Sequence, residues 1–272
     1  MFLAPVISFV TYYPDRGVLG RIGIARDAGV TVYVFDNTPG GSEILRNGES
    51  ENINLMGTGE NLGLGAALHL MMQSVAENGF SHVFYFDQDT VFTKDTMQWL
   101  RAWLDLNEST LDSKRALWNF TDSTVPLSPA EAIIQPGYLM VSSGSLFNLS
   151  AVKQLGWHNP KIFLECIDYE LCSRALCAGF SIAKVEGCVG IDHLSLQPRE
   201  SLKLLGREFH YRIYSLARTV GFLRGLLILA LGSIYRGQWV FGVKCLRNIL
   251  THLVIQIRAI GFHFLRIILG RR

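Results

Sequence analysis

The stretch HVFYFDQDT, residues 82–90, places a run of aromatic and β-branched residues directly before two acidic ones. Such a run is typical of a buried strand, which would end at Asp87 and Asp89. Two carboxylates two residues apart at a strand end can converge on one hard cation, and that cation can bridge two oxygens of a diphosphate. A strand-end turn in which Asp89 caps the next helix explains the same letters, so the interpretation depends on the surrounding sequence.

Predicted strands and helices alternate on both sides of this stretch, which predicts an α/β fold with a parallel sheet and right-handed crossovers. Strands are predicted at residues 5–13, 31–36, 52–56, 82–87 and 180–186, and helices at residues 17–28, 66–78, 94–106 and 168–178. Residues 115–142 contain three prolines and are predicted to be irregular. A long helix is predicted over residues 200–222.

Acidic residues follow three of the predicted strands. Asp15, Asp36 and Asp87 lie at or just after the ends of these strands. In open parallel sheets, ligands bind beyond the carboxyl ends of the strands, so these side chains mark a candidate site. Each also has an ordinary interpretation as a turn or helix-cap residue, and for Asp15 that interpretation is equally good.

Charge divides the chain into two parts. Residues 219–272 contain eight Lys or Arg and no Asp or Glu, whereas residues 1–218 carry 17 basic and 23 acidic side chains, a net charge of −6. A basic, apolar tail predicts attraction to a membrane surface. Because its apolar runs are interrupted by basic residues, we expect amphipathic helices that lie on the membrane without crossing it. The alternative is a helical subdomain packed on the body or on another copy of the chain, and a nucleic-acid partner is not expected.

Six motifs together resemble the bacterial rhamnosyltransferases among the family-2 inverting glycosyltransferases. They are VTYYPD (10–15), DNT (36–38), ENLGLGAAL (60–68), FDQDT (86–90), SSGSLFN (142–148) and IDYELCSR (167–174). The resemblance implies a GT-A domain over residues 1–218, which is a Rossmann-like nucleotide-sugar-binding sheet with an acceptor subdomain, followed by the amphipathic helices of residues 219–272. It also implies dTDP-rhamnose as donor, Mg²⁺ or Mn²⁺ as cofactor, a lipid-linked glycan as acceptor, and a peripheral location on the cytoplasmic face of the membrane.

The resemblance also implies roles for individual residues. Asp168 would be the catalytic base, and Asp89 with His193 would hold the metal. The nucleotide sugar would contact Thr11, Tyr13, Asp15, Asp36, Asn61, Gly63, Asp87 and Gln88, and the glutamine between the two aspartates points to the rhamnosyl branch. The acceptor or diphosphate would be met by Ser143, Gly144, Glu165, Tyr211 and Arg212.

Several alternatives stay open at this point. Asp168 is also explained as a helix cap, Glu165 or Glu170 is a candidate to share its role, and Glu170 is well placed to pair with Arg174 one helical turn later. A UDP-hexose is the alternative donor. A nucleotidyltransferase is disfavoured because residues 11–17 lack the Gly-rich loop expected there. A non-catalytic scaffold of polysaccharide assembly would not need Asp87, Asp89 and Asp168 together.

Overall fold

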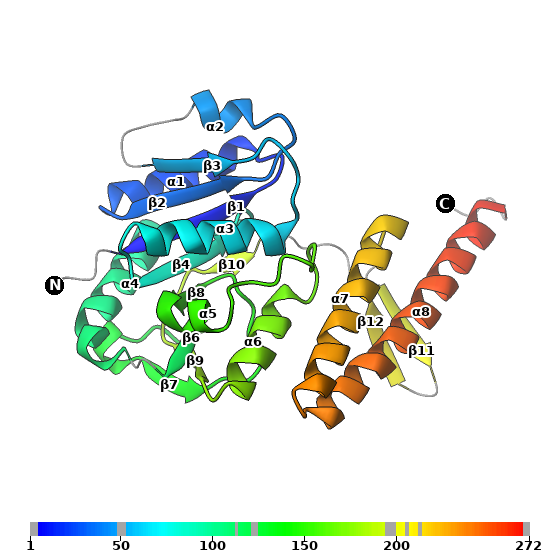
Figure 1. The fold of residues 1–272 in the computed structure, drawn as a ribbon. Helices are drawn as coiled ribbons and strands as arrows, with labels where there is room; N and C mark the ends of the chain where they lie inside the picture. The colour runs from blue at the N-terminus through cyan, green and yellow to red at the C-terminus, as the bar shows by residue number, and fades with distance from the viewer. Residues whose placement is uncertain are drawn as a thin grey trace. The chain divides into compact units, whose positions relative to one another are not determined.

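The computed structural model describes residues 5–47, 53–111, 114–120, 125–193, 200–204, 207–211 and 214–268. The chain forms two compact units (Figure 1). The first, the N-terminal unit, comprises Met1–Phe163 and Ile167–Leu194, and the second, the C-terminal unit, comprises Leu164–Cys166 and Ser195–Arg272.

An eight-stranded sheet forms the centre of the N-terminal unit, in the order β3-β2-β1-β4-β8-β6-β9-β7. Strands β1, β2, β3 and β4 are parallel to one another, and β6 is parallel to β9. Strand β8 runs antiparallel between β4 and β6, and β7 pairs antiparallel with β9. The strands are β1 Val6–Thr11, β2 Thr31–Asp36, β3 Ile53–Gly57, β4 His82–Asp87, β6 Arg115–Phe120, β7 Ile133–Pro136, β8 Ser145–Asn148 and β9 Ser181–Glu186.

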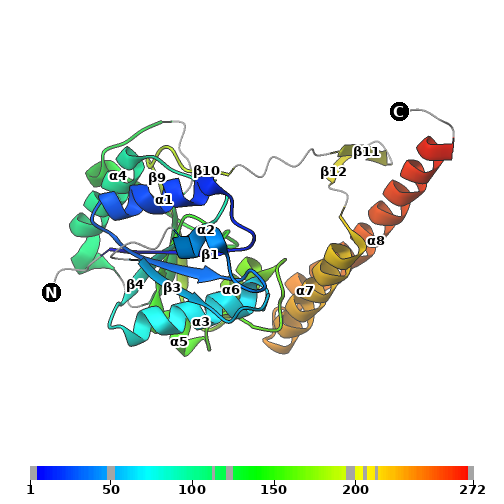
Figure 2. The same ribbon diagram turned by 90° about the horizontal axis from the view of Figure 1, so that it is seen from above.

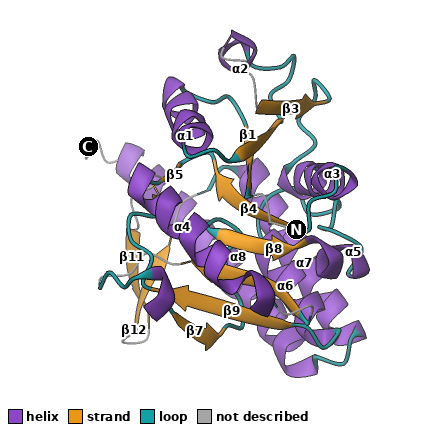
Figure 3. Cartoon of the chain, turned by 90° about the vertical axis from the view of Figure 1, so that its left-hand side faces the viewer, coloured by secondary structure: helices purple, strands orange, loops and turns teal. Residues whose placement is uncertain are grey.

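Helices cover both faces of this sheet (Figure 3). Helix α1 (Arg16–Asp27) packs against α4 (Lys94–Asn107), and α3 (Leu64–Glu77) packs against α5 (Leu149–Gln154). The remaining elements of this unit are α2 Glu43–Asn47, α6 Ile167–Cys177, the short strands β5 Thr90–Val91 and β10 Asp192–His193, and the 3₁₀ turns η1 Glu108–Thr110 and η2 Pro129–Glu131. The predicted α/β class is therefore confirmed, with a mixed sheet in place of the parallel one.

Two predictions of local structure were wrong. The stretch 115–142, expected to be irregular, contributes strands β6 and β7, because Pro126 and Pro129 lie between the two strands and Pro136 is the last residue of β7. The helix expected over residues 200–222 is replaced by a hairpin of β11 (Glu200–Leu204) and β12 (Arg207–Tyr211), followed by α7 (Leu216–Tyr235). The helix starts late because the Ser215 side chain caps it by accepting a hydrogen bond from the Arg218 N–H (3.3 Å).

Two long helices dominate the C-terminal unit. Helices α7 and α8 (Trp239–Ile268) lie side by side as a hairpin (Figure 2). Gly237, in the turn between them, adopts a φ of 83°, which favours glycine. Both helices are long and apolar enough to cross a membrane, and only 33% of the apolar window of α7 and 17% of that of α8 are buried. Much of their apolar surface therefore has no partner within the described chain.

Candidate functional site

The carboxyl ends of β1, β2 and β4 bring three predicted site residues to one edge of the sheet. Thr11 lies opposite Asp36 in the β1–β2 register, and Asp87 lies opposite Val10 in the β1–β4 register. The side chain of Thr11 is buried and faces the carbonyl of Phe35 at 3.5 Å. This edge is the position expected for a ligand in a sheet of this kind.

Asp36 shapes the loop after β2. Its carboxylate accepts hydrogen bonds from the N–H groups of Thr38 (3.0 Å) and Ser42 (2.5 Å), and the residue is 6% exposed. The hydroxyl oxygen of Thr38 in turn accepts a hydrogen bond from the Tyr13 N–H (3.0 Å). The predicted nucleotide-binding aspartate thus joins the loops after β1 and β2 into one surface.

Gln88 clamps the loop after β1. Its Oε1 accepts a hydrogen bond from the Tyr12 N–H (2.7 Å), and its Nε2 donates to the Tyr12 carbonyl (3.1 Å). The neighbouring Tyr13 has a φ of 45° and is 63% exposed, so its ring is presented to solvent at the site edge. Both polar ends of the Gln88 amide are therefore engaged by the protein, and its role in the structure is to hold the loop that carries Tyr13.

Asp15 acts as the cap of α1. Its Oδ1 accepts a hydrogen bond from the Val18 N–H (3.2 Å) and lies 3.7 Å from Nη2 of Arg21. Arg21 also donates to the carbonyl of Gln88, between the two aspartates of the FDQDT motif. The structure thus shows the capping interpretation of Asp15. It also places Arg21, which the sequence did not single out, next to the FDQDT motif.

The Gly-rich segment forms a second loop at this edge. Oδ1 of Asn61 accepts hydrogen bonds from Nδ2 of Asn37 (3.1 Å) and from the Gly63 N–H (3.0 Å). Gly63 has a φ of 80°, and a Cβ there would lie 2.7 Å from the carbonyl oxygen of Phe163. Glycine is therefore required by the close approach of the loop before α6 to the start of α3.

Ser143 and Gly144 lie next to the acidic motif. The Ser143 hydroxyl oxygen accepts a hydrogen bond from the Asp87 N–H (2.9 Å) and lies 2.7 Å from that of Thr90. Gly144 has a φ of 74°, and a Cβ there would lie 2.9 Å from the carbonyl oxygen of Phe120. The close-packing explanation of Gly144 is thus visible, and Ser143 bonds the backbone at Asp87 and the side chain of Thr90.

Tyr85 connects the acidic residues of the site. Its hydroxyl donates a hydrogen bond of 2.6 Å to Oδ1 of Asp87, and the residue is 1% exposed. Burial raises the pKa of Tyr85 well above its ordinary value, and the negative charges of Asp87, Asp168 and Asp89 raise it further. The Tyr85 hydroxyl thus bonds Asp87 directly and is influenced by the charges of Asp89 and Asp168. A tyrosine two residues before Asp87, and so on the same face of β4, was the available sequence signal.

The remaining predicted site residues lie on β10 and in the C-terminal unit. The backbone of His193 pairs with that of Thr90, next to Asp89. Tyr211 belongs to β12, and Arg212 lies outside the described residues. Glu165 belongs to the C-terminal unit, where its carboxylate pairs with Arg218.

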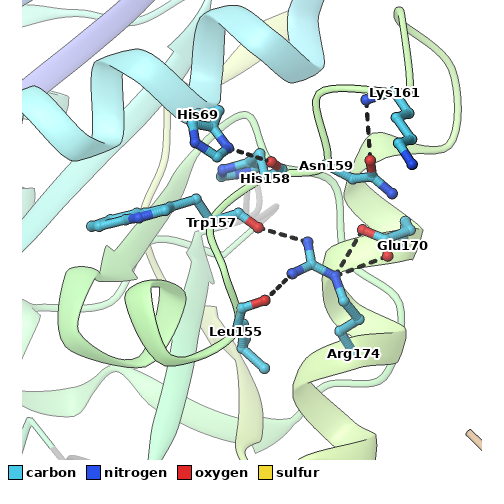
Figure 4. A network of polar contacts seen from close by, with 8 residues as sticks. All are labelled: His69, Leu155, Trp157, His158, Asn159, Lys161, Glu170 and Arg174. Carbon is cyan, nitrogen blue, oxygen red and sulfur yellow. Dashed lines mark hydrogen bonds and ion pairs between the residues drawn. The ribbon is translucent and has the colours of Figure 1, made fainter.

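A buried ion pair fixes the loop between α5 and α6 (Figure 4). Arg174 Nε donates to both carboxylate oxygens of Glu170, at 2.8 and 2.9 Å, and the Glu170 side chain is 4% exposed. The other nitrogens of Arg174 donate to the carbonyls of Leu155 and, at 2.7 Å, of Trp157. Glu170 thus has the salt-bridge role left open above, and this network secures the chain that leads to Asp168.

The fold is that of the GT-A glycosyltransferases. No protein-family model and no curated protein matches the sequence. Among solved structures, S. aureus TarS 1–349 in complex with UDP-GlcNAc has a TM-score of 0.54 at 12% identity, covering 91% of this chain and 71% of that one. A longer TarS structure has the same TM-score at 11% identity, and this chain spans 43% of it. GalNAc-T7 with UDP, GalNAc and Mn²⁺ has a TM-score of 0.51 at 12% identity, covering 71% of this chain and 44% of that one.

Proposed function

We propose that this protein is an inverting, metal-dependent glycosyltransferase that uses a nucleotide sugar. The observation that carries the proposal is the hydrogen bond from the Tyr85 hydroxyl to Asp87, together with the electrostatic effect of Asp168 and Asp89 on the same buried hydroxyl. This cluster belongs to the edge of the sheet where the loops of Tyr13, Asp36 and Asn61 also meet. A GT-A fold offers its donor site at this edge, and the acidic groups supply the two functions that an inverting transfer needs, cation binding and proton acceptance.

The residues of the FDQDT motif fit a divalent cation. Carboxylate oxygens are the ligands that Mg²⁺ and Mn²⁺ prefer, and Mg²⁺ is commonly held by one or two carboxylates together with substrate phosphates. Within the described residues no group of three His, Cys, Asp or Glu side chains is placed to hold a metal ion. We propose that Asp89 binds the cation, with Asp87 beside it and His193 as a further ligand. The cation would neutralise charge on the leaving diphosphate.

Asp168 is the proposed base. It is the second residue of α6, and its negative charge acts on the buried Tyr85 hydroxyl. In an inverting transfer the acceptor hydroxyl gives its proton to Asp168 as its oxygen bonds to the anomeric carbon. The bond from that carbon to the nucleoside diphosphate breaks on the other face, and no second acid is required because a diphosphate whose charge is neutralised would leave without taking up a proton.

We propose dTDP-rhamnose as donor and a lipid-linked surface glycan as acceptor, at the cytoplasmic face of the membrane. The donor assignment is supported by the rhamnosyltransferase-like motifs, and the second candidate, a UDP-hexose, is favoured by the fold's likeness to TarS, which was solved with UDP-GlcNAc. The acceptor and location are supported by the apolar helices α7 and α8 with their basic residues.

A panel of nucleotide sugars tests this proposal. We expect dTDP-rhamnose with Mg²⁺ or Mn²⁺ to raise the melting temperature more than UDP-glucose does, and to be consumed only when metal is present. Asp89→Ala should abolish metal-dependent turnover without lowering the melting temperature of the free protein. Preference for a UDP-hexose would reassign the donor, and full activity of Asp89→Ala at low metal concentration would contradict the metal assignment.

A further inference from the structure

The three residues before α6 belong to a different unit from the helix they lead into. Leu164–Cys166 cluster with the C-terminal unit, whereas Phe163 and Ile167, on either side, cluster with the N-terminal unit. Asp168 follows Cys166 by only two residues. Whatever holds this short segment therefore acts directly on the chain that enters the helix of the proposed base.

Arg218 of α7 holds the segment through Glu165. Its Nε donates a hydrogen bond of 2.8 Å to Oε1 of Glu165, and its Nη2 lies 2.7 Å from the same oxygen. The guanidinium also stacks over the ring of Tyr214, with Cζ 4.5 Å from the ring centroid. An arginine engaged by a carboxylate and an aromatic ring is restricted in orientation, so the contact fixes geometry as well as charge.

Packing holds the same segment against α7. A Cβ added at Gly225 would lie 2.5 Å from the carbonyl oxygen of Glu165, so only glycine allows this approach. Cys166 is 9% exposed and forms a hydrophobic cluster with Leu226, Leu229, Ala230 and Cys245. Cys166 also has a φ of 72°, a left-handed conformation that is uncommon for a residue with a side chain and that persists where the surroundings determine it.

We propose that Arg218 is a positioning residue for the reaction: through Glu165 it fixes the chain entering α6 and thereby the place of Asp168. This inference rests on the proposed function, because it takes Asp168 as the base. A base must lie within hydrogen-bond reach of the proton it removes, and a misplacement of about 1 Å can cost on the order of 10²-fold in rate.

The proposal also assigns Glu165, which the sequence left as a possible partner of the base. If Glu165 were itself the base, its carboxylate would be indispensable and no change at Arg218 would replace it. If it serves only to bind Arg218, reversing both charges should keep the contact. The double variant Glu165→Arg with Arg218→Glu separates these two roles.

The experiment uses the full chain with a saturating donor and measures kcat for transfer, the donor Kd and the melting temperature. We expect Arg218→Ala and Glu165→Gln to lower kcat by about 10- to 100-fold with the donor Kd unchanged, since donor-side residues are untouched. The charge-reversed double variant should recover at least part of the loss. Arg26→Ala, at an exposed arginine of α1 paired with its neighbour Asp27, is the matched control and should retain wild-type kcat.

Three results would overturn the inference. Arg218→Ala with kcat within about twofold of wild type would show that the contact is dispensable, and equal loss of donor binding and kcat would show a general structural defect. If both single variants fail to fold, a charge-reversed double variant that folds without activity would also contradict it. A wild-type protein that consumes no nucleotide sugar would instead reject the proposed function itself.

Discussion

At the scale of single residues, the role of Asp168 follows from what lies near it. Asp168 influences the buried Tyr85 hydroxyl, as Asp87 and Asp89 do, although it is 81 residues away from Asp87 in sequence. A residue that only capped α6 would not need to lie within electrostatic reach of the acidic motif. This electrostatic effect on a buried group beside Asp87 is the reason for which we propose a chemical role for Asp168.

Replacing Asp168 by asparagine should nearly eliminate transfer while donor binding is retained. The amide keeps the shape of the side chain but cannot accept the proton, and loss of one positioned base costs about 10²–10⁴-fold. The measurement is kcat for transfer beside the donor Kd from titration calorimetry. If donor binding disappeared together with activity, Asp168 would be a donor-side or structural residue.

His158 makes the fold sensitive to acid. The residue is fully buried, and burial, followed by the charge of Arg174, lowers its pKa from 6.5 to about 3. The unfolded chain takes up a proton near pH 6.5, whereas the folded chain resists protonation until about pH 3, so acid favours the unfolded state. The stability that His158 contributes is complete above pH 6.5 and is lost as the pH falls toward 3.

We therefore expect the His158→Phe variant to lose less stability on acidification than the wild type. The difference should approach about 1.4 kcal/mol per pH unit below the unfolded pKa, measured by urea unfolding at several pH values between 4 and 8. Part of the pH dependence should remain, because burial also lowers the pKa of His82 to about 4. Parallel pH profiles for the variant and the wild type would show that His158 does not control acid stability.

At the scale of elements, the Arg174–Glu170 pair joins α6 to the loop after α5. Because the Glu170 side chain is only 4% exposed, removing Arg174 would take the ion-pair partner from a buried carboxylate and a donor from the carbonyls of Leu155 and Trp157. Arg174→Ala should cost about 3–5 kcal/mol of unfolding free energy. The double variant Arg174→Met with Glu170→Leu should recover much of this, since it removes both charges. Equal stability of Arg174→Ala and wild type in urea would contradict this account.

The sequence was sufficient to predict those strands whose local residue pattern agrees with their place in the fold. Apolar runs ending in Asp36 and Asp87 predicted β2 and β4 to within the observed bounds, because buried parallel strands have a distinctive composition. It was not sufficient for the hairpin of β11 and β12, where residues suited to a helix pair as strands. Nor was it sufficient for Gln88, whose role depends on hydrogen bonds with Tyr12, 76 residues away in the sequence.

At the scale of the whole molecule, charge and apolar surface are unevenly distributed. The described part of α8 exposes Val243, Leu250, Val254 and Ile257 at helical spacing, and Lys244 and Arg247 are also exposed. An apolar stripe bordered by basic residues is the pattern of a helix that lies in the membrane interface. Length and composition alone would also permit a spanning hairpin, so the orientation of these helices calls for a direct measurement.

We expect the protein to bind vesicles that contain anionic lipid and to be released partly by high salt and fully by alkaline carbonate. Each basic residue near an anionic surface contributes about 1 kcal/mol, which salt screens, whereas the apolar contribution is not screened. Replacing Val243, Leu250, Val254 and Ile257 by serine should abolish binding even at low salt, while Lys244→Gln with Arg247→Gln should weaken it only on anionic vesicles. Both variants should keep the affinity of wild type for the donor nucleotide, because the proposed donor-site residues lie in the N-terminal unit.

Resistance to carbonate would mean that the helices cross the bilayer. A wild-type protein that is freely soluble and oligomeric would mean that the apolar stripe packs against another copy of the chain, and the proposed membrane location would then be wrong.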